Sequence, residues 1–555
     1  MAAPPSRFLG SARIIAVCTL ASRVTGLARD ITLNHIFGQN WVQDAFNYGF
    51  LIPNLFRRLF GEGALSAVFV PVFTDVLTKR GRPAAWRLLG RVAGLMGLAL
   101  TILLLLLELG TLTIGSLWSG GEMRSLQIGL TAVMAPFMFG VCVVALFSSI
   151  LNCLNHFTVP ALLPIVLNVM IIVGATLVGP WFGEELQRQV YGVGLCVIIA
   201  AMIQLAILLP VLRGHGVHFR LSLDRSDPDL RRIVRMFIPI LLGQGLLLFN
   251  VFFDAQICTM LTRGPGEAAT FSFLGRSIAY PLTHGALSAV NNAQRLYQFP
   301  LGVLAISLAT AAFPTFSRYA THRDTAGLRS ALAQSLRLAI YVGLPSGLML
   351  ILLGESIIAL LFQHGRFGPE QTVRAAEVLR WYGLGMTAFC CQHILLRGFY
   401  SLKDTITPMK ISCWLVGLNL LLNLALIWTV REPIFGISTS ITATLHVCIS
   451  VWLLRRRLGG TMGATAILAS AGKTAVATIA ASLATWAALR WAQGIELTSI
   501  GSVGNAALPV FVPLATAAGV YLLASRLLRM EEPGWLLSRR VDSAMSRSAP
   551  EQRRA

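Results

Sequence analysis

Long apolar segments recur along the whole chain, separated by short polar stretches. Near-continuous apolar runs occupy residues 92–118, 161–180 and 505–525, and comparable runs lie between them. A helix needs about 20 apolar residues to cross roughly 30 Å of hydrocarbon. The pattern therefore predicts a series of membrane-spanning helices. We place fourteen of them at residues 11–37, 46–78, 93–118, 127–153, 159–180, 189–212, 233–262, 285–317, 333–353, 376–399, 408–430, 436–454, 463–491 and 505–528.

The composition supports this interpretation for the chain as a whole. Of its 555 residues, 55% are hydrophobic and only 12% are charged. Soluble globular proteins carry about 25% charged residues, because a surface that faces water needs polar cover. The sequence therefore predicts an all-α polytopic membrane protein with no soluble domain of useful size.

The formal net charge of +21 lies mainly in loops between the predicted spans, so it bears on membrane orientation more than on nucleic-acid binding. The loops that follow even-numbered predicted spans are basic, as in residues 79–91 and 213–235, whereas residues 38–45 contain no lysine or arginine. By the positive-inside rule, this alternation places both termini in the cytoplasm. Nucleic-acid binding would instead require the charge on one exposed face. We therefore interpret the charge as setting orientation, with no nucleic-acid partner.

Two sets of landmarks suggest an internal duplication. Pro71 and Pro314 stand in similar Phe-rich segments 243 residues apart, and Pro160 and Pro408 stand at the start of similar spans 248 residues apart. An asparagine, Asn168 or Asn419, follows each of the latter prolines; chance similarity between apolar segments is the alternative explanation. Two six-helix lobes of this kind commonly enclose the substrate site of a transporter. The predicted parts are an N-lobe at 1–215, a C-lobe at 216–460, an added helix pair at 461–530 and a cytoplasmic tail at 531–555.

The first two predicted spans carry charged residues where a simple anchor would not. A charge at the bilayer centre costs at least about 2.5–3.5 kcal/mol, so such residues usually face a wet cavity or a partner. Arg23 and Asp30 are seven residues apart and project almost together from a helix. Arg58 and Glu62 are spaced to pair, although arginines can also extend to the headgroup layer. The polar residues of these spans that we take as candidate site residues include Ser22, Arg23, Arg29, Asp30, Asn54, Arg57, Arg58 and Glu62.

A further arginine, Arg295, opens the eighth span, which the duplication places opposite the second. Guanidinium groups bind phosphate in a bidentate manner and keep their charge in a desolvated site. Several arginines around one cavity indicate an anionic substrate with one or more phosphates. The excess of arginine over acid argues against a carrier of cations.

Another set of polar residues combines acid, amide and hydroxyl groups. Asp254 lies in the seventh span, Asn419 and Asn423 lie four apart in the eleventh, and Thr439 opens the twelfth. Carboxylate, amide and hydroxyl oxygens suit a hard cation, so this could be a sodium or proton site. Hydrogen bonding between helices is the alternative. Residues 264–292 predict an external loop or a broken helix ahead of the eighth span.

Specific motifs resemble a known family. Residues 22–30 (SRVTGLARD), 53–63 (PNLFRRLFGEG) and 69–73 (FVPVF) closely resemble the MurJ (MviN) family of lipid II flippases. The similarity continues through 295–300 and 398–401 and covers essentially the whole chain. The family belongs to the multidrug/oligosaccharidyl-lipid/polysaccharide exporter superfamily. The resemblance implies two six-helix lobes with two extra C-terminal helices.

The resemblance also implies an activity. The substrate would be lipid II, the undecaprenyl-diphosphate-linked disaccharide-pentapeptide of peptidoglycan, moved from the inner to the outer leaflet of the bacterial cytoplasmic membrane by alternating access. The protein would be a transporter and not an enzyme, a monomer among membrane lipids, with peptidoglycan polymerases as candidate partners. Sodium ions or the membrane potential would drive it, and the groove of the last two helices would take the lipid tail.

The resemblance assigns roles to the polar residues named above. It implies that Gln294 and Gln298 replace acidic residues that some members carry beside the eighth-span arginine. The implied diphosphate ligands are Arg23, Arg29, Arg57 and Arg295, with Ser22 and Arg58 beside them; the cavity and outer-gate residues are Asp44, Asn54 and Glu62; the sodium ligands are Asp254, Asn419, Asn423 and Thr439.

Four other functions compete with this one. A drug exporter of the same superfamily should show acidic cavity residues, whereas an exporter of another polyprenyl-linked saccharide would need the same arginines. A membrane glycosyltransferase or phosphatase would need paired carboxylates or a nucleophile in a loop, and Glu184 with Glu185 fit a solvated turn instead. A scaffold without transport would not need the complete arginine set.

Overall fold

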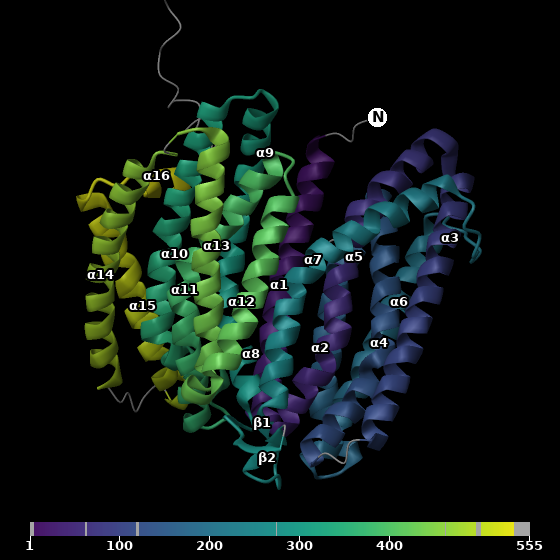
Figure 1. Cartoon of the computed structure of the whole chain (residues 1–555), viewed down its shortest axis with the longest axis horizontal. Coiled ribbons are helices and arrows are strands. Elements are labelled where there is room, and N and C mark those ends of the chain that lie inside the picture. Colours follow the sequence, from purple (N-terminus) through teal and green to yellow (C-terminus); the bar gives the residue numbers. More distant parts are fainter. Residues whose placement is uncertain are drawn as a thin grey trace, which may run out of the picture. The chain divides into compact units, whose positions relative to one another are not determined.

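The chain folds almost entirely into long helices (Figure 1). A computed structural model describes residues 5–61, 64–117, 121–273, 275–460, 462–494 and 501–537. The first seven α-helices are α1 (Pro5–Phe37), α2 (Trp41–Gly61), α3 (Ala64–Leu117), α4 (Glu122–Cys153), α5 (Thr158–Val173), α6 (Leu186–Gly214) and α7 (Pro228–Met260). The later ones are α8 (Ala286–Pro300), α9 (Ser307–Thr321), α10 (Thr325–Phe362), α11 (Pro369–Ser401), α12 (Ile406–Val430), α13 (Pro433–Leu458), α14 (Ala464–Gln493), α15 (Gly501–Leu527) and α16 (Glu532–Leu537).

Helices lie at all fourteen predicted spans. Within the described residues, ten helical segments are both long and apolar enough to cross a membrane. The second predicted span, 46–78, is divided between α2 and the start of α3. The helix α3 then turns at Gly81, whose φ of 78° is in the left-handed region that favours glycine, and continues as the third span. The protein is therefore an all-α, multi-pass membrane protein, as the apolar pattern predicted.

Two predicted spans contain irregular helix. A π-helical segment, Gly174–Val178, and a 3₁₀ segment, Gly179–Phe182, follow α5. A second π-helical segment, Leu301–Ile306, joins α8 to α9 directly after Pro300. The missing amide proton of Pro300 disturbs the regular hydrogen bonding of the helix at this point.

The segment before α8 contains short strands in place of the broken helix that was one of the two sequence-based alternatives. Strand β2 (Thr270–Phe273) pairs antiparallel with β3 (Arg276–Ala279), and β1 (Thr262–Arg263) pairs parallel with β4 (Leu282–Thr283). Because its backbone groups bond across strands, the segment forms a structured loop.

The chain divides into two compact units. The first contains residues 1–288 and 364–367, and the second contains residues 289–363 and 368–555. The predicted boundary between lobes, at residue 215, falls within the first unit, and the duplicated lobes stay a prediction.

In the first unit, α3, α4 and α6 lie side by side, and α2 packs against α4 (Figure 1). The contact between α2 and α4 is close at Gly49, where an added Cβ would lie 2.8 Å from the Met134 side chain. The rings of Phe50 and Phe137 meet nearby, with centroids 6.1 Å apart.

In the second unit, α10 packs against α11, and α14 and α15 pack against α10. The backbones of α10 and α11 approach closely at Gly347, where an added Cβ would lie 2.4 Å from the Gly383 carbonyl oxygen. The Tyr521 hydroxyl of α15 donates to the Tyr341 carbonyl of α10 at 2.6 Å. The two C-terminal helices are therefore packed directly on this unit.

Candidate functional site

The two arginines of α1 lie in different environments. Arg23 is exposed, whereas only 9% of Arg29 is exposed. The Arg29 guanidinium donates to Asp30 Oδ1 from Nε at 2.9 Å and from Nη2 at 2.6 Å, and Nη1 donates to Asn168 Oδ1 of α5 at 3.1 Å. Asn168 Nδ2 in turn donates to the Ser22 carbonyl at 3.2 Å. Arg29 therefore joins α1 to α5, and the Asp30 carboxylate lies against its neighbour Arg29.

The polar residues of α2 form a group of half-buried side chains. Asn54, Arg57 and Arg58 are all half-buried, and Arg57 Nε donates to Asn54 Oδ1 at 2.9 Å. This hydrogen bond across one helical turn orients the Arg57 guanidinium. Glu62, the proposed partner of Arg58, lies outside the described residues.

Asp44 is fully buried and holds the backbone at the start of α8. Its Oδ2 accepts from the Gly285 N–H at 2.6 Å, and its Oδ1 accepts from the Ser288 N–H at 2.7 Å and from the Ser288 hydroxyl at 2.6 Å. The first N–H groups of a helix have no partner within the helix, and a carboxylate satisfies them with a favourable charge. Asp44, from the first turn of α2, thus caps a second helix.

Arg295 belongs to the second unit and is exposed on α8. Its neighbours on α8 bind α11: the Tyr297 and Tyr382 rings stack with centroids 4.6 Å apart, and Gln294 Nε2 donates to the Tyr382 hydroxyl at 3.0 Å. Gln294 therefore has a packing role between α8 and α11.

The predicted sodium ligands are distributed over both units. In the second unit, Asn423 Nδ2 donates to Asn419 Oδ1 at 3.0 Å, and Asn419 Nδ2 donates to the Ser438 hydroxyl at 3.1 Å. The Thr439 hydroxyl donates to the Phe435 carbonyl at 2.7 Å. The bond between Asn419 and Ser438 joins α12 to α13, as the alternative of interhelical hydrogen bonding predicts, and the other two bonds each stay within one helix.

Asp254, the predicted acid of this set, belongs to the first unit. It is 5% exposed and accepts from Asn250 Nδ2 at 3.3 Å.

Two partners of the site residues were not identified as such from the sequence. In the sequence, Asn168 stands out only as a marker of the duplication, and Ser288 does not stand out. An amide inside an apolar span was a usable signal for Asn168, because buried amides need partners. A serine at the third position of a helix carries no comparable signal, so the Ser288 contact required the structure.

Comparisons with known proteins identify the family of the chain. The family model described as "Lipid II flippase MurJ" matches residues 33–500. The probable lipid II flippase MurJ of Bdellovibrio bacteriovorus is 30% identical over 461 residues, which cover 81% of this chain and 82% of that protein. The probable lipid II flippase MurJ of Vibrio cholerae is 29% identical over 458 residues, which cover 80% and 82%.

Solved structures share the fold. A lipid II flippase MurJ in an inward closed conformation matches with a TM-score of 0.72 and 20% identity, over 92% of this chain and 98% of that one. An inward-facing multidrug resistance MATE family transporter of the MOP superfamily matches with a TM-score of 0.61 and 14% identity, over 80% and 98%. The family match spans most of the chain, and these likenesses give the fold. The chain belongs to the lipid II flippase MurJ family.

Proposed function

We propose that this protein translocates lipid II across the bacterial cytoplasmic membrane, which is the activity named for its relatives. The family is one of flippases, so the protein is a transporter and not an enzyme. The observation that carries the proposal is the arginine set of α1 and α2, with Arg23 exposed and Arg57 and Arg58 half-buried. Arginines kept in helices otherwise suited to a bilayer need an anionic partner or water.

The diphosphate of lipid II supplies such a partner. Arg23 and Arg57 on α1 and α2, and Arg295 on α8, are the proposed phosphate ligands, because each carries a guanidinium that is exposed or half-buried. Arg29 takes a different role in this proposal. Its bonds to Asp30 and Asn168 hold α1 in position, so it supports the ligands beside it without being one itself.

Transport proceeds by alternating access in this proposal. The headgroup crosses in a polar cavity while the polyprenyl tail stays in lipid, next to α14 and α15. Asp44 and Asn54 contribute to the gate and the cavity. Both termini face the cytoplasm, as the basic loops favour, and the protein acts as a monomer that can deliver lipid II to peptidoglycan polymerases.

The membrane potential or sodium ions reset the carrier. A positive charge that moves through the membrane field gains about 2.3 kcal/mol per 100 mV. The oxygen atoms of Asp254, Asn419, Asn423 and Thr439 are the candidate sodium ligands. Flipping in proteoliposomes should depend on one of these two driving forces, and rates unchanged without potential and without sodium would overturn the coupling.

Complementation of a bacterium depleted of its lipid II flippase tests the function. The wild-type chain should restore growth, whereas Arg23→Ala and Arg57→Ala should not. The control is Arg188→Ala, which removes an exposed arginine paired with exposed Glu185 and should restore growth. Failure of the wild-type chain, or rescue by both site variants, would contradict the proposal.

A second candidate substrate is another polyprenyl-diphosphate-linked saccharide, which would bind the same arginines. Reconstituted flipping of lipid II and of an undecaprenyl-diphosphate saccharide without the pentapeptide separates the two. Selective transport of lipid II is expected.

A further inference from the structure

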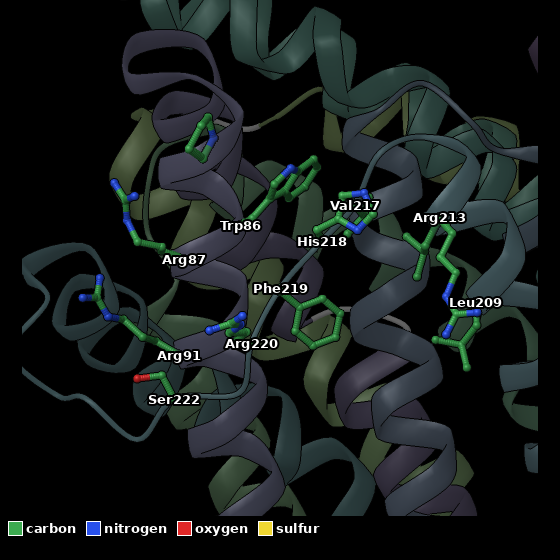
Figure 2. Close-up of a pocket in the computed structure, with 12 residues that line it drawn as sticks. Trp86, Arg87, Arg91, Leu209, Arg213, Val217, His218, Phe219, Arg220 and Ser222 are labelled. Atoms are coloured by element: carbon green, nitrogen blue, oxygen red, sulfur yellow. The ribbon is translucent and has the colours of Figure 1, made fainter.

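A basic pocket lies in the first unit, away from the arginines of α1 and α2 (Figure 2). Its volume is about 850 Å³. Ligand pockets usually measure about 300–1,000 Å³. The walls come from α3 just after its turn at Gly81, from the end of α6, and from the extended segment that follows α6. None of the roles assigned above uses this pocket.

The extended segment is built tightly onto α3. An added Cβ on Gly90 would lie 2.0 Å from the Arg220 carbonyl oxygen, and one on Gly94 would lie 2.3 Å from the Ser222 carbonyl oxygen. The Ser222 N–H donates to the Gly90 carbonyl at 3.1 Å. Gly90 and Gly94 lie one turn apart on α3 and leave room for the backbone of the extended segment. This close contact fixes the position of Arg220.

The arginines of the pocket divide into two kinds. Arg91 is neutralised, because it forms ion pairs with Asp224 at 2.8 Å and with Asp227. In the part of the chain that the structure describes, no carboxylate lies within ion-pair distance of Arg87, Arg213 or Arg220. These three side chains are exposed, so the pocket keeps an excess of positive charge.

Aromatic and apolar side chains lie among these arginines. In Figure 2 the Phe219 ring lies between α3, which carries Trp86 and Arg87, and α6, which carries Arg213. Arg220 lies in front of α3 in this view. Along the same segment, Leu221 is 72% exposed and Leu223 is 58% exposed. Cationic groups beside exposed leucines suit a ligand with both phosphate and hydrocarbon.

We propose that this pocket binds the headgroup of an anionic phospholipid. Arg87, Arg213 and Arg220 contact the phosphate, Trp86 and Phe219 line the pocket around the headgroup, and Leu221 and Leu223 lie against the acyl chains. The pocket stands at the end of the apolar helix α6, on the side that the basic loops predict to be cytoplasmic. Basic pockets between transmembrane helices on that side bind phospholipid headgroups through this chemistry.

Native mass spectrometry of the full-length protein in detergent, with added phosphatidylglycerol or phosphatidylcholine, tests this site. Wild type should retain phosphatidylglycerol and gain thermal stability from it, because a ligand that binds only the folded state stabilises that state. The triple variant R87Q/R213Q/R220Q should bind phosphatidylglycerol about 100-fold more weakly, since each arginine at an anionic lipid surface contributes roughly a fivefold factor.

The matched control is R225Q/R232Q/R235Q, which removes three exposed arginines from the same loop and the start of α7, outside the pocket. It should bind phosphatidylglycerol like wild type. Equal binding by wild type and the pocket variant, or equal loss in both variants, would overturn the proposal.

Glycerol phosphate, which has the headgroup but no acyl chains, separates a lipid from a soluble ligand. Weak binding of this probe by wild type is expected. If glycerol phosphate binds as tightly as phosphatidylglycerol and displaces it, the assignment to a lipid is overturned. The readout is binding, so the outcome is independent of whether the chain flips lipid II.

Discussion

Arg23 and Arg29 belong to one sequence motif and one helix, six residues apart, and yet they have different surroundings. Arg23 is exposed on α1, while Arg29 is buried against Asp30 and Asn168. Side chains six residues apart point to different sides of a helix, so only one of the two faces α5. Membership in a motif therefore does not assign the same role to both arginines.

Arg337, which binds the C-terminal end of the described chain, resembles Arg29 in holding a buried acceptor. Arg337 of α10 donates from Nε to Glu532 Oε1 at 2.9 Å, and the Ser470 hydroxyl donates to the same oxygen at 2.6 Å. Arg337 also lies over the Trp535 ring, 4.6 Å from its centroid. The start of the predicted tail is thus docked on α10 and α14. Arg29 and Arg337 hold buried or half-buried acceptors and stabilise the fold, whereas Arg23 is exposed and is a proposed phosphate ligand.

The largest effect on stability is expected for Arg29→Ala. The substitution leaves the Asp30 carboxylate and Asn168 without their guanidinium, and breaking a buried ion pair costs about 3 kcal/mol or more. Thermal denaturation of the purified protein in detergent measures the loss. The double variant R29A/D30N serves as a control, because it also removes the charge left behind, and it should recover part of the stability. A melting temperature of Arg29→Ala equal to that of wild type would contradict the structural role.

Glu532→Gln should have the next largest effect. The Glu532 carboxylate is 1% exposed and accepts charge-assisted bonds, so its loss should cost about 2 kcal/mol. Thermal denaturation again gives the measurement. Glu531→Gln is the matched control, because Glu531 also pairs with Arg337 but its side chain is 64% exposed. A surface pair contributes about 1 kcal/mol or less. Equal effects of the two variants would contradict the docking of α16.

The pH dependence of protein stability gives a second test of the contacts of Glu532. Burial alone would raise the pKa of this carboxyl, but hydrogen bonds from Ser470 and the charge of Arg337 outweigh burial, so its pKa lies below the ordinary 4.5. A lowered folded-state pKa gives stability that is present above the unfolded value and is lost as the pH falls through the folded value. Wild type should therefore lose more stability than Glu532→Gln below about pH 4.5. Parallel pH profiles of the two proteins would contradict this.

Asn168→Ala should have a smaller effect than the loss of either charged partner. Asn168 accepts from Arg29 and donates to the Ser22 carbonyl, but Arg29 keeps its bonds to Asp30. One net hydrogen bond contributes about 1 kcal/mol, so a loss of this size is expected in thermal denaturation. In a double-mutant cycle, Arg29→Ala and Asn168→Ala should be less than additive, because they remove a shared bond. Strict additivity would mean that the two residues are not coupled.

The sequence predicted the membrane helices well because an apolar stretch long enough to span a bilayer has few alternatives. It also identified Arg23 and Arg29 as unusual residues, and the family resemblance implied a role for Asp44. It could not assign their contacts, because the partner of Arg29 lies 139 residues away on α5 and the partner of Asp44 lies 244 residues away in the first turn of α8. Contacts at such distances depend on how the helices pack, which a local pattern does not specify.

The basic loops illustrate a different limit. Their charge predicted the orientation of the chain in the membrane. The positive-inside rule counts every arginine of a loop in the same way. The structure separates Arg91, which holds Asp224 and Asp227, from Arg87, which lines a pocket. The two arginines lie one turn apart on α3, so the difference comes from the segment that packs beside the helix.

Arg23→Ala should have the smallest effect on stability and a large effect on transport. This variant tests most directly whether Arg23 and Arg29 have different roles. Substitutions of exposed residues usually change stability by no more than about 0.5 kcal/mol. Transport should be lost, because the proposed phosphate ligand is gone, while Arg23→Lys should keep partial transport, since an ammonium group retains the charge but cannot bind phosphate in a bidentate manner. Thermal denaturation and reconstituted flipping of lipid II, measured on the same preparations, give both quantities. Two results would contradict the comparison. Arg23→Ala could unfold as readily as Arg29→Ala, which would give Arg23 a structural role, or it could flip lipid II at the wild-type rate, which would remove its role in transport.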